Sequence, residues 1–126
     1  MPKCATVLVI AASAMLLLTP AATPATTANS ICAPLTGHAW HALGKTGKKY
    51  KWEVIGTAFT CANAKHWVLK FLSTRVHGTG RVALHGGPSG YHCYGSQLDA
   101  RGYPYWGLCY QGTPAFPKNG ISWFPA

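Results

Sequence analysis

The sequence predicts an α+β fold, in which one helix packs on a small antiparallel sheet and two disulfides hold the domain together. Three observations predict it. One segment repeats its apolar residues at helical spacing, several short segments have the composition of strands, and four cysteines follow the N-terminal segment. The roughly 100 residues beyond that segment are enough for one domain with a modest core.

The N-terminal part, residues 1–28, is predicted to be a secretory signal peptide with a cleavage region of small residues. An uncharged, almost wholly apolar run extends from Ala5 to Leu18, and the positively charged Lys3 precedes it. This run is shorter than the roughly 20 residues that cross a membrane, and Ala25 and Ala28 each fit a signal peptidase site. We therefore expect a secreted, extracellular protein; a short uncleaved anchor is the alternative.

The exported domain is predicted to comprise residues 29–126, without a transmembrane segment. A Thr/Ala/Pro-rich tract ends at Ser30, so ordered structure is expected to begin near Ile31. Ten of the 11 Lys and Arg residues and both acidic residues lie in this domain, which gives it a formal charge of +8. Such a charge favours an anionic polymer, a glycan or another cell-surface component as partner, and the alternative is that it serves solubility alone. No cofactor is expected.

Four cysteines lie in the exported domain: Cys32, Cys61, Cys93 and Cys109. An even number of cysteines in a short exported chain predicts two disulfides, and three pairings are possible. The spacing lacks the close pairs typical of zinc sites, so no metal is expected. We favour Cys32–Cys61 with Cys93–Cys109, because this pairing joins nearest neighbours and its second loop is short enough to close a β-hairpin.

The first elements of the domain are a turn and a strand. The cluster Gly44–Lys49 has the Gly and Lys content of a basic turn. From Tyr50 to Thr57 apolar residues alternate with polar ones, which predicts a half-buried strand. On this strand Trp52 and Val54 are expected inside, whereas Glu53 is expected on the solvent face.

A helix is predicted from Cys61 to about Thr74, with Thr60 as its N-cap. Apolar residues recur there at intervals of three and four, which is the pattern of an amphipathic helix. Phe71 is expected in the core, together with Trp52 and with Trp67 or Val54. Cys61 falls on the buried face in the first turn. Its thiol is therefore expected to be part of a structural disulfide rather than to act as a nucleophile.

The second half of the domain is predicted to be extended. Its expected elements are a Gly-rich loop (75–89) containing a short apolar run (82–84), a strand (91–94), a turn (97–102), a strand (103–110) and a final extended piece (121–124). Pro104 lacks a backbone N–H, so we expect the strand that it begins to lie at an edge.

Several of these segments form a pattern that resembles a group of small secreted proteins of actinobacteria. In that pattern an extended Tyr/Val segment, here Tyr50 and Val54, precedes a helix that opens with Cys61-Ala62-Asn63-Ala64. A Gly-aromatic-x-Cys strand follows, here Gly90-Tyr91-His92-Cys93, and then a last cysteine and an aromatic C-terminal strand. The resemblance implies export and an α+β disulfide fold; it implies no catalytic residues.

The candidate binding residues are aromatic and basic. Exposed rings can stack on sugars or bases while Lys and Arg meet anionic groups. Most of the aromatic residues are needed for the core of so small a domain, which leaves the best surface candidates in the strand after the turn. The candidates are Tyr103, Tyr105 and Trp106, together with Lys45, Lys48 and Lys49 of the basic turn. The leading hypothesis is thus a non-enzymatic binder of an anionic or cell-surface ligand.

Two alternatives remain open. A small secreted ribonuclease-like hydrolase would need a general base, a general acid and phosphate-binding groups, for which the candidates are Glu53, His92, Arg81 and Arg101. That hypothesis requires these residues to meet in one cleft. A secreted inhibitor or toxin that acts on another protein is the second alternative, and the Gly-rich loop at 77–90 is the feature that points to it. The six histidines lack a pattern typical of a metal or catalytic site.

Overall fold

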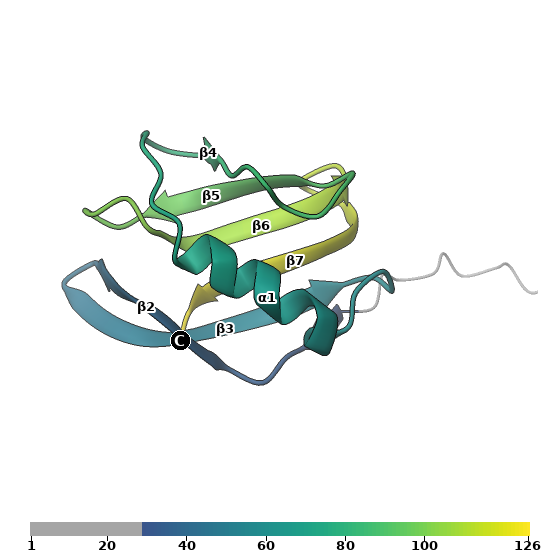
Figure 1. Cartoon of the computed structure of the whole chain (residues 1–126), viewed down its shortest axis with the longest axis horizontal. Helices are drawn as coiled ribbons and strands as arrows, with labels where there is room; N and C mark the ends of the chain where they lie inside the picture. Colours follow the sequence, from purple (N-terminus) through teal and green to yellow (C-terminus); the bar gives the residue numbers. More distant parts are fainter. Residues whose placement is uncertain (1–28) are drawn as a thin grey trace, which may run out of the picture.

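The computed structural model describes residues 29–126, which form one helix and one seven-stranded sheet (Figure 1). The elements are β1 (Asn29–Ile31), β2 (Leu35–Ala42), β3 (Lys45–Ile55), α1 (Cys61–Leu72), β4 (Val82–Ala83), β5 (His92–Leu98), β6 (Pro104–Gly112) and β7 (Pro117–Pro125). The α+β class is confirmed. The predicted signal peptide lies outside the described residues.

The sheet is larger than the small sheet that the sequence predicted. Its strand order is β1-β3-β7-β6-β5-β4, with β2 also paired to β3, and every pairing is antiparallel. β3 is the longest strand: β1 and β2 share one of its edges, and β7 occupies the other. Strand structure already begins at Asn29, because β1 pairs with residues 53–55, so the expected start near Ile31 was slightly late.

The predicted basic turn at Gly44–Lys49 is wrong, because most of it belongs to β3. The chain reverses at Leu43 and Gly44, whose φ angles of 52° and 71° give the left-handed backbone of a tight hairpin. Residues 45–47 then pair with 40–42 of β2. The lysines therefore lie along an extended strand rather than around a turn.

The edge position predicted from Pro104 is also wrong. β6 lies inside the sheet, between β5 and β7. Pro104 is the first residue of the strand, a position where the missing N–H leaves no gap in the ladder. Its carbonyl oxygen accepts a hydrogen bond from Nε1 of Trp123 at 3.0 Å, so the residue is buried and bonded.

The helix confirms its predicted start and cap. The Thr60 hydroxyl accepts a hydrogen bond from the backbone N–H of Asn63, and the Asn63 side chain accepts one from the Thr60 N–H. This reciprocal pair satisfies two N–H groups that the first turn leaves open. α1 ends at Leu72, two residues before the predicted end, and Ser73 bonds back to the carbonyls of the last turn.

The core lies between α1 and one face of the sheet. Phe71 stacks on Trp123 of β7 at a centroid distance of 5.6 Å, and Trp52 and Val54 of β3 are buried beside them, as predicted. Trp67 is partly buried. Gly107 of β6 leaves room for the Trp123 indole, since a Cβ there would lie 2.2 Å from the ring.

The preferred disulfide pairing is confirmed. Cys32–Cys61 ties the chain between β1 and β2 to the first turn of α1. Cys93–Cys109 joins register partners on β5 and β6. One bond therefore fastens the helix to the sheet, and the other fastens two neighbouring strands.

Candidate ligand-binding site

The second face of the sheet carries no helix from the described residues, and we call it the open face. Trp123, Cys109 and Cys93 point toward α1, so their neighbours along each strand point the other way. The open-face side chains of the three strands β5, β6 and β7 are His92, Tyr94, Trp106, Leu108, Tyr110, Ser122 and Phe124. This face is therefore rich in aromatic rings.

The rings of the open face contact one another across neighbouring strands. Tyr94 and Tyr110 lie edge to face at 5.9 Å, and His92 lies 5.6 Å from Tyr110. Trp106 lies 6.0 Å from Phe124, and the Trp106 residue is 48 % exposed. Cross-strand pairs of this kind hold the rings in fixed orientations, so the face is a preformed surface.

Cationic groups flank these rings. The Arg81 guanidinium lies 4.2 Å from the centroid of the Tyr94 ring. On the other side of the aromatic rings, on the neighbouring strand β3, the exposed Lys51 is the register partner of Phe124. Glu53 lies on the same face of β3, partly buried. Cations thus border the aromatic rings at both sides.

One end of the sheet holds a pocket of about 460 Å³ that brings together three predicted binding residues: Lys45, Tyr105 and Trp106. Trp40 and Leu43 of the β2–β3 hairpin form one wall, and Phe124 forms another. The prediction that Tyr105 is a surface residue is wrong. Its exposure is 8 %, and the Trp40 ring stacks on its ring at a centroid distance of 6.5 Å.

The other three predicted binding residues lie outside this pocket. Lys48 and Lys49 are exposed on β3, and the Lys49 carbonyl accepts a hydrogen bond from Nε1 of Trp40. Tyr103 precedes β6, where it stacks on His38 at 3.7 Å. The sequence missed Trp40, because nothing in its own segment shows that β2 folds back toward β6.

The turn between β5 and β6 is organised by Asp99, whose side chain is fully buried. Its carboxylate accepts hydrogen bonds from the backbone N–H groups of Arg101 at 2.9 Å and Tyr103 at 3.1 Å. The Arg101 guanidinium contacts the same carboxylate at 3.5 Å and donates to the Ala39 carbonyl at 2.7 Å. Asp99 and Arg101 therefore fix the turn against β2.

The residues of the hydrolase alternative do not gather in one place. Arg81 and His92 both line a pocket of about 420 Å³ at the β5 edge of the sheet. Glu53 lies on β3, three strands away, which corresponds to roughly 14 Å at the usual strand spacing. Arg101 is bound to Asp99 in the β5–β6 turn. The general base and general acid of that hypothesis are thus separated.

Within residues 29–126, no three His, Cys, Asp or Glu side chains are placed to hold a metal ion together. The same stretch contains no helix with the length and apolarity needed to cross a membrane.

Tyr50 of β3 is buried in the core, and its phenol is influenced by the charges of the β5–β6 turn. Burial, and to a lesser degree the negative charge of Asp99, raises the pKa of Tyr50 to about 12, while Arg101 acts in the opposite direction. The phenol donates a hydrogen bond to the His38 carbonyl at 2.6 Å. The folded state therefore stabilises the protonated form of the Tyr50 phenol.

We expect stability to fall as the pH rises from about 10 to about 12, since the unfolded chain releases the Tyr50 proton before the folded chain does. Below pH 10 both states keep the proton and the contribution is fully present. Thermal unfolding measured from pH 10 to pH 12 should show a smaller fall in melting temperature for Tyr50→Phe than for the wild type. Parallel curves for the two proteins would contradict this role for Tyr50.

Comparison with known proteins gives no match: no family model, curated protein or solved structure is similar to this chain.

Proposed function

We propose that this chain is a secreted, non-enzymatic protein that binds an anionic polymer of a cell surface through the open face of its sheet. The observation that carries the proposal is the set of paired rings on that face with Arg81 at one side and Lys51 at the other. Aromatic rings offer flat, apolar surfaces to sugar rings, and the cations meet acidic groups.

Charge and exposure support this proposal. Of the two acidic side chains, Asp99 is enclosed by the β5–β6 turn and Glu53 is partly buried, so the basic residues dominate the accessible surface. Rings gathered on one accessible face are typical of interaction sites. The two disulfides are typical of proteins that work in oxidising, extracellular surroundings.

The proposal is tested by a binding titration at increasing salt. The probe is a polysaccharide with uronic acid groups, and a neutral polysaccharide of similar length is its control. We expect measurable affinity for the acidic polymer that falls steeply as salt rises, because binding releases counterions. Undetectable binding at low salt would overturn the proposal.

Matched variants locate the site. Trp106→Ala and Arg81→Gln should each weaken polymer binding by about five- to tenfold, which corresponds to about 1 kcal/mol. Their controls are Phe116→Ala, which removes an exposed ring from the β6–β7 turn, and Lys65→Gln, which removes an exposed charge from α1. Equal losses in the variants and the controls would place binding elsewhere.

A further inference from the structure

A second basic site lies away from the open face, where one backbone hydrogen bond brings two arginines together. The Val76 N–H donates to the Gly102 carbonyl at 2.8 Å. Gly102 has a φ of 86°, and a Cβ there would lie 2.5 Å from the Val76 carbonyl oxygen, so only glycine allows this approach. Because Arg75 precedes Val76 and Arg101 precedes Gly102, the contact places the two arginines near each other.

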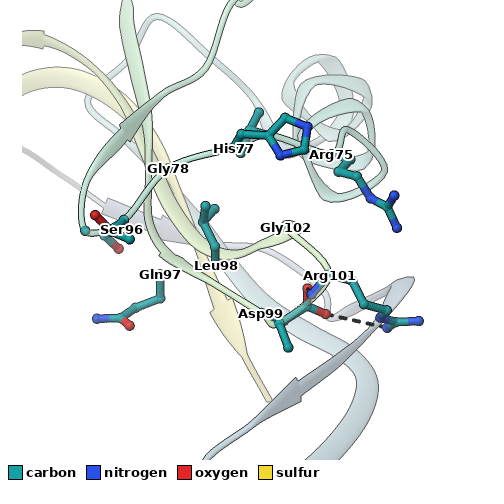
Figure 2. Close-up of a pocket in the computed structure, with 13 residues that line it drawn as sticks. Arg75, His77, Gly78, Ser96, Gln97, Leu98, Asp99, Arg101 and Gly102 are labelled. Atoms are coloured by element: carbon teal, nitrogen blue, oxygen red, sulfur yellow. Dashed lines mark hydrogen bonds and ion pairs between the residues drawn. The ribbon is translucent and has the colours of Figure 1, made fainter.

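These arginines line a pocket of about 670 Å³ between the segment after α1 and the β5–β6 turn. Figure 2 shows the Arg75 and Arg101 side chains at one end of this pocket and Ser96 and Gln97 at the other. His77 also lines it. Its walls contain basic, polar and apolar residues together with Asp99, and they come from two segments that the Val76–Gly102 bond holds together.

Both guanidinium groups are held beside the same aromatic ring. Arg75 lies 5.5 Å and Arg101 lies 5.7 Å from the centroid of Tyr103. The Tyr103 ring is itself held by its stacking on His38. Both positive charges are therefore held next to one ring, and the ring contacts themselves do not neutralise them.

The charge in the pocket is only partly compensated. Arg101–Asp99 is the one ion pair found among residues 29–126, and the backbone of the turn already uses the Asp99 carboxylate as an acceptor. Arg75 has no carboxylate partner in this part of the chain. Arg101 donates through Nη2, which leaves its Nε–H and Nη1–H groups available.

We propose that this pocket binds a phosphate or sulfate group, with Arg75 and Arg101 as its donors. Guanidinium groups offer paired N–H donors whose geometry suits tetrahedral oxyanions, and such an anion would supply the charge that Arg75 lacks. The proposal does not depend on polymer binding at the open face. Gln97 lines both this pocket and the pocket beside Trp106, so a phosphate or sulfate ester on a larger molecule could also reach that aromatic pocket.

The test is a titration of the full domain, with both disulfides intact, followed by amide NMR shifts. The probes are inorganic phosphate, inorganic sulfate and glycerol 3-phosphate, and sodium chloride at equal ionic strength is the control. We expect saturable shifts confined to residues 75–80 and 96–102. The comparison of glycerol 3-phosphate with inorganic phosphate distinguishes an ester ligand from a free anion. Shifts equal to those in chloride would overturn the proposal.

Matched arginine variants complete the test. Arg75→Gln should weaken phosphate binding by about tenfold or more, since it removes charged hydrogen bonds. Arg81→Gln is the control, because Arg81 is also an exposed arginine beside a tyrosine ring but lies outside this pocket. It should leave phosphate binding unchanged while it weakens polymer binding at the open face, so the failure of one proposal is distinguishable from the failure of the other. Equal losses in the two variants would overturn the site.

Discussion

Removing the Cys32–Cys61 disulfide is expected to lower the free energy of unfolding by about 3–4 kcal/mol. The bond closes a loop of 29 residues that contains all of β2 and β3, so the unfolded chain gains much freedom when it is absent. For a domain of this size the melting temperature should fall by roughly 12–32 °C. Thermal unfolding of the Cys32→Ala/Cys61→Ala protein measures the change.

Reduction of the wild type is the companion experiment, because the alanine variant also loses the packing of two sulfur atoms. Reduction opens Cys93–Cys109 as well, whose 16-residue loop is worth about 3 kcal/mol more in the same model. The reduced wild type should therefore melt below the variant. A melting temperature that reduction leaves unchanged would show that the disulfides do not constrain this fold.

Asp99→Ala is expected to destabilise the domain by about 3 kcal/mol, since two backbone N–H groups would lose a buried charged acceptor. The β5–β6 turn would loosen, and Arg101 would lose its position in the phosphate pocket. Chemical denaturation measures the stability. The same protein should bind phosphate more weakly than the wild type does.

Glu53→Ala is the matched control, because it removes the same charge from the other acidic residue. Glu53 is partly buried on β3 and accepts no hydrogen bond from another side chain or turn in the described structure, so its loss should cost no more than about 0.5 kcal/mol. If the two substitutions cost the same, net charge rather than the Asp99 hydrogen bonds would explain the effect.

Local signals were sufficient to predict the helix, its cap and the second half of β3. Thr60, the spacing of apolar residues after it, and the alternation from Tyr50 onward all act within a few residues of one another. The disulfide pairing followed from distances along the chain, because both bonds join cysteines that are nearest neighbours in sequence. The resemblance to actinobacterial secreted proteins stays a prediction.

The parts that sequence reasoning missed depend on contacts between distant segments. The β2–β3 hairpin falls in a Gly- and Lys-rich stretch that lacks an apolar alternation. The ring that stacks on the buried Tyr105, Trp40, lies far away in the sequence on β2. Pro104 could be placed at an edge or at the start of an interior strand, and only the pairing of β7 on the other side of β6 decides between these. The Arg75–Arg101 pair likewise requires the contact between Val76 and Gly102.

The position of β7 has a consequence for the order of folding. β7 pairs with β3 on one side and with β6 on the other, so it joins two groups of strands that share no other pairing. When the chain is synthesised from its N-terminus, the two groups of strands cannot join into one sheet until residues 117–125 have been made. Assembly of the sheet therefore waits for a late, non-local step, which is typical of slow folding.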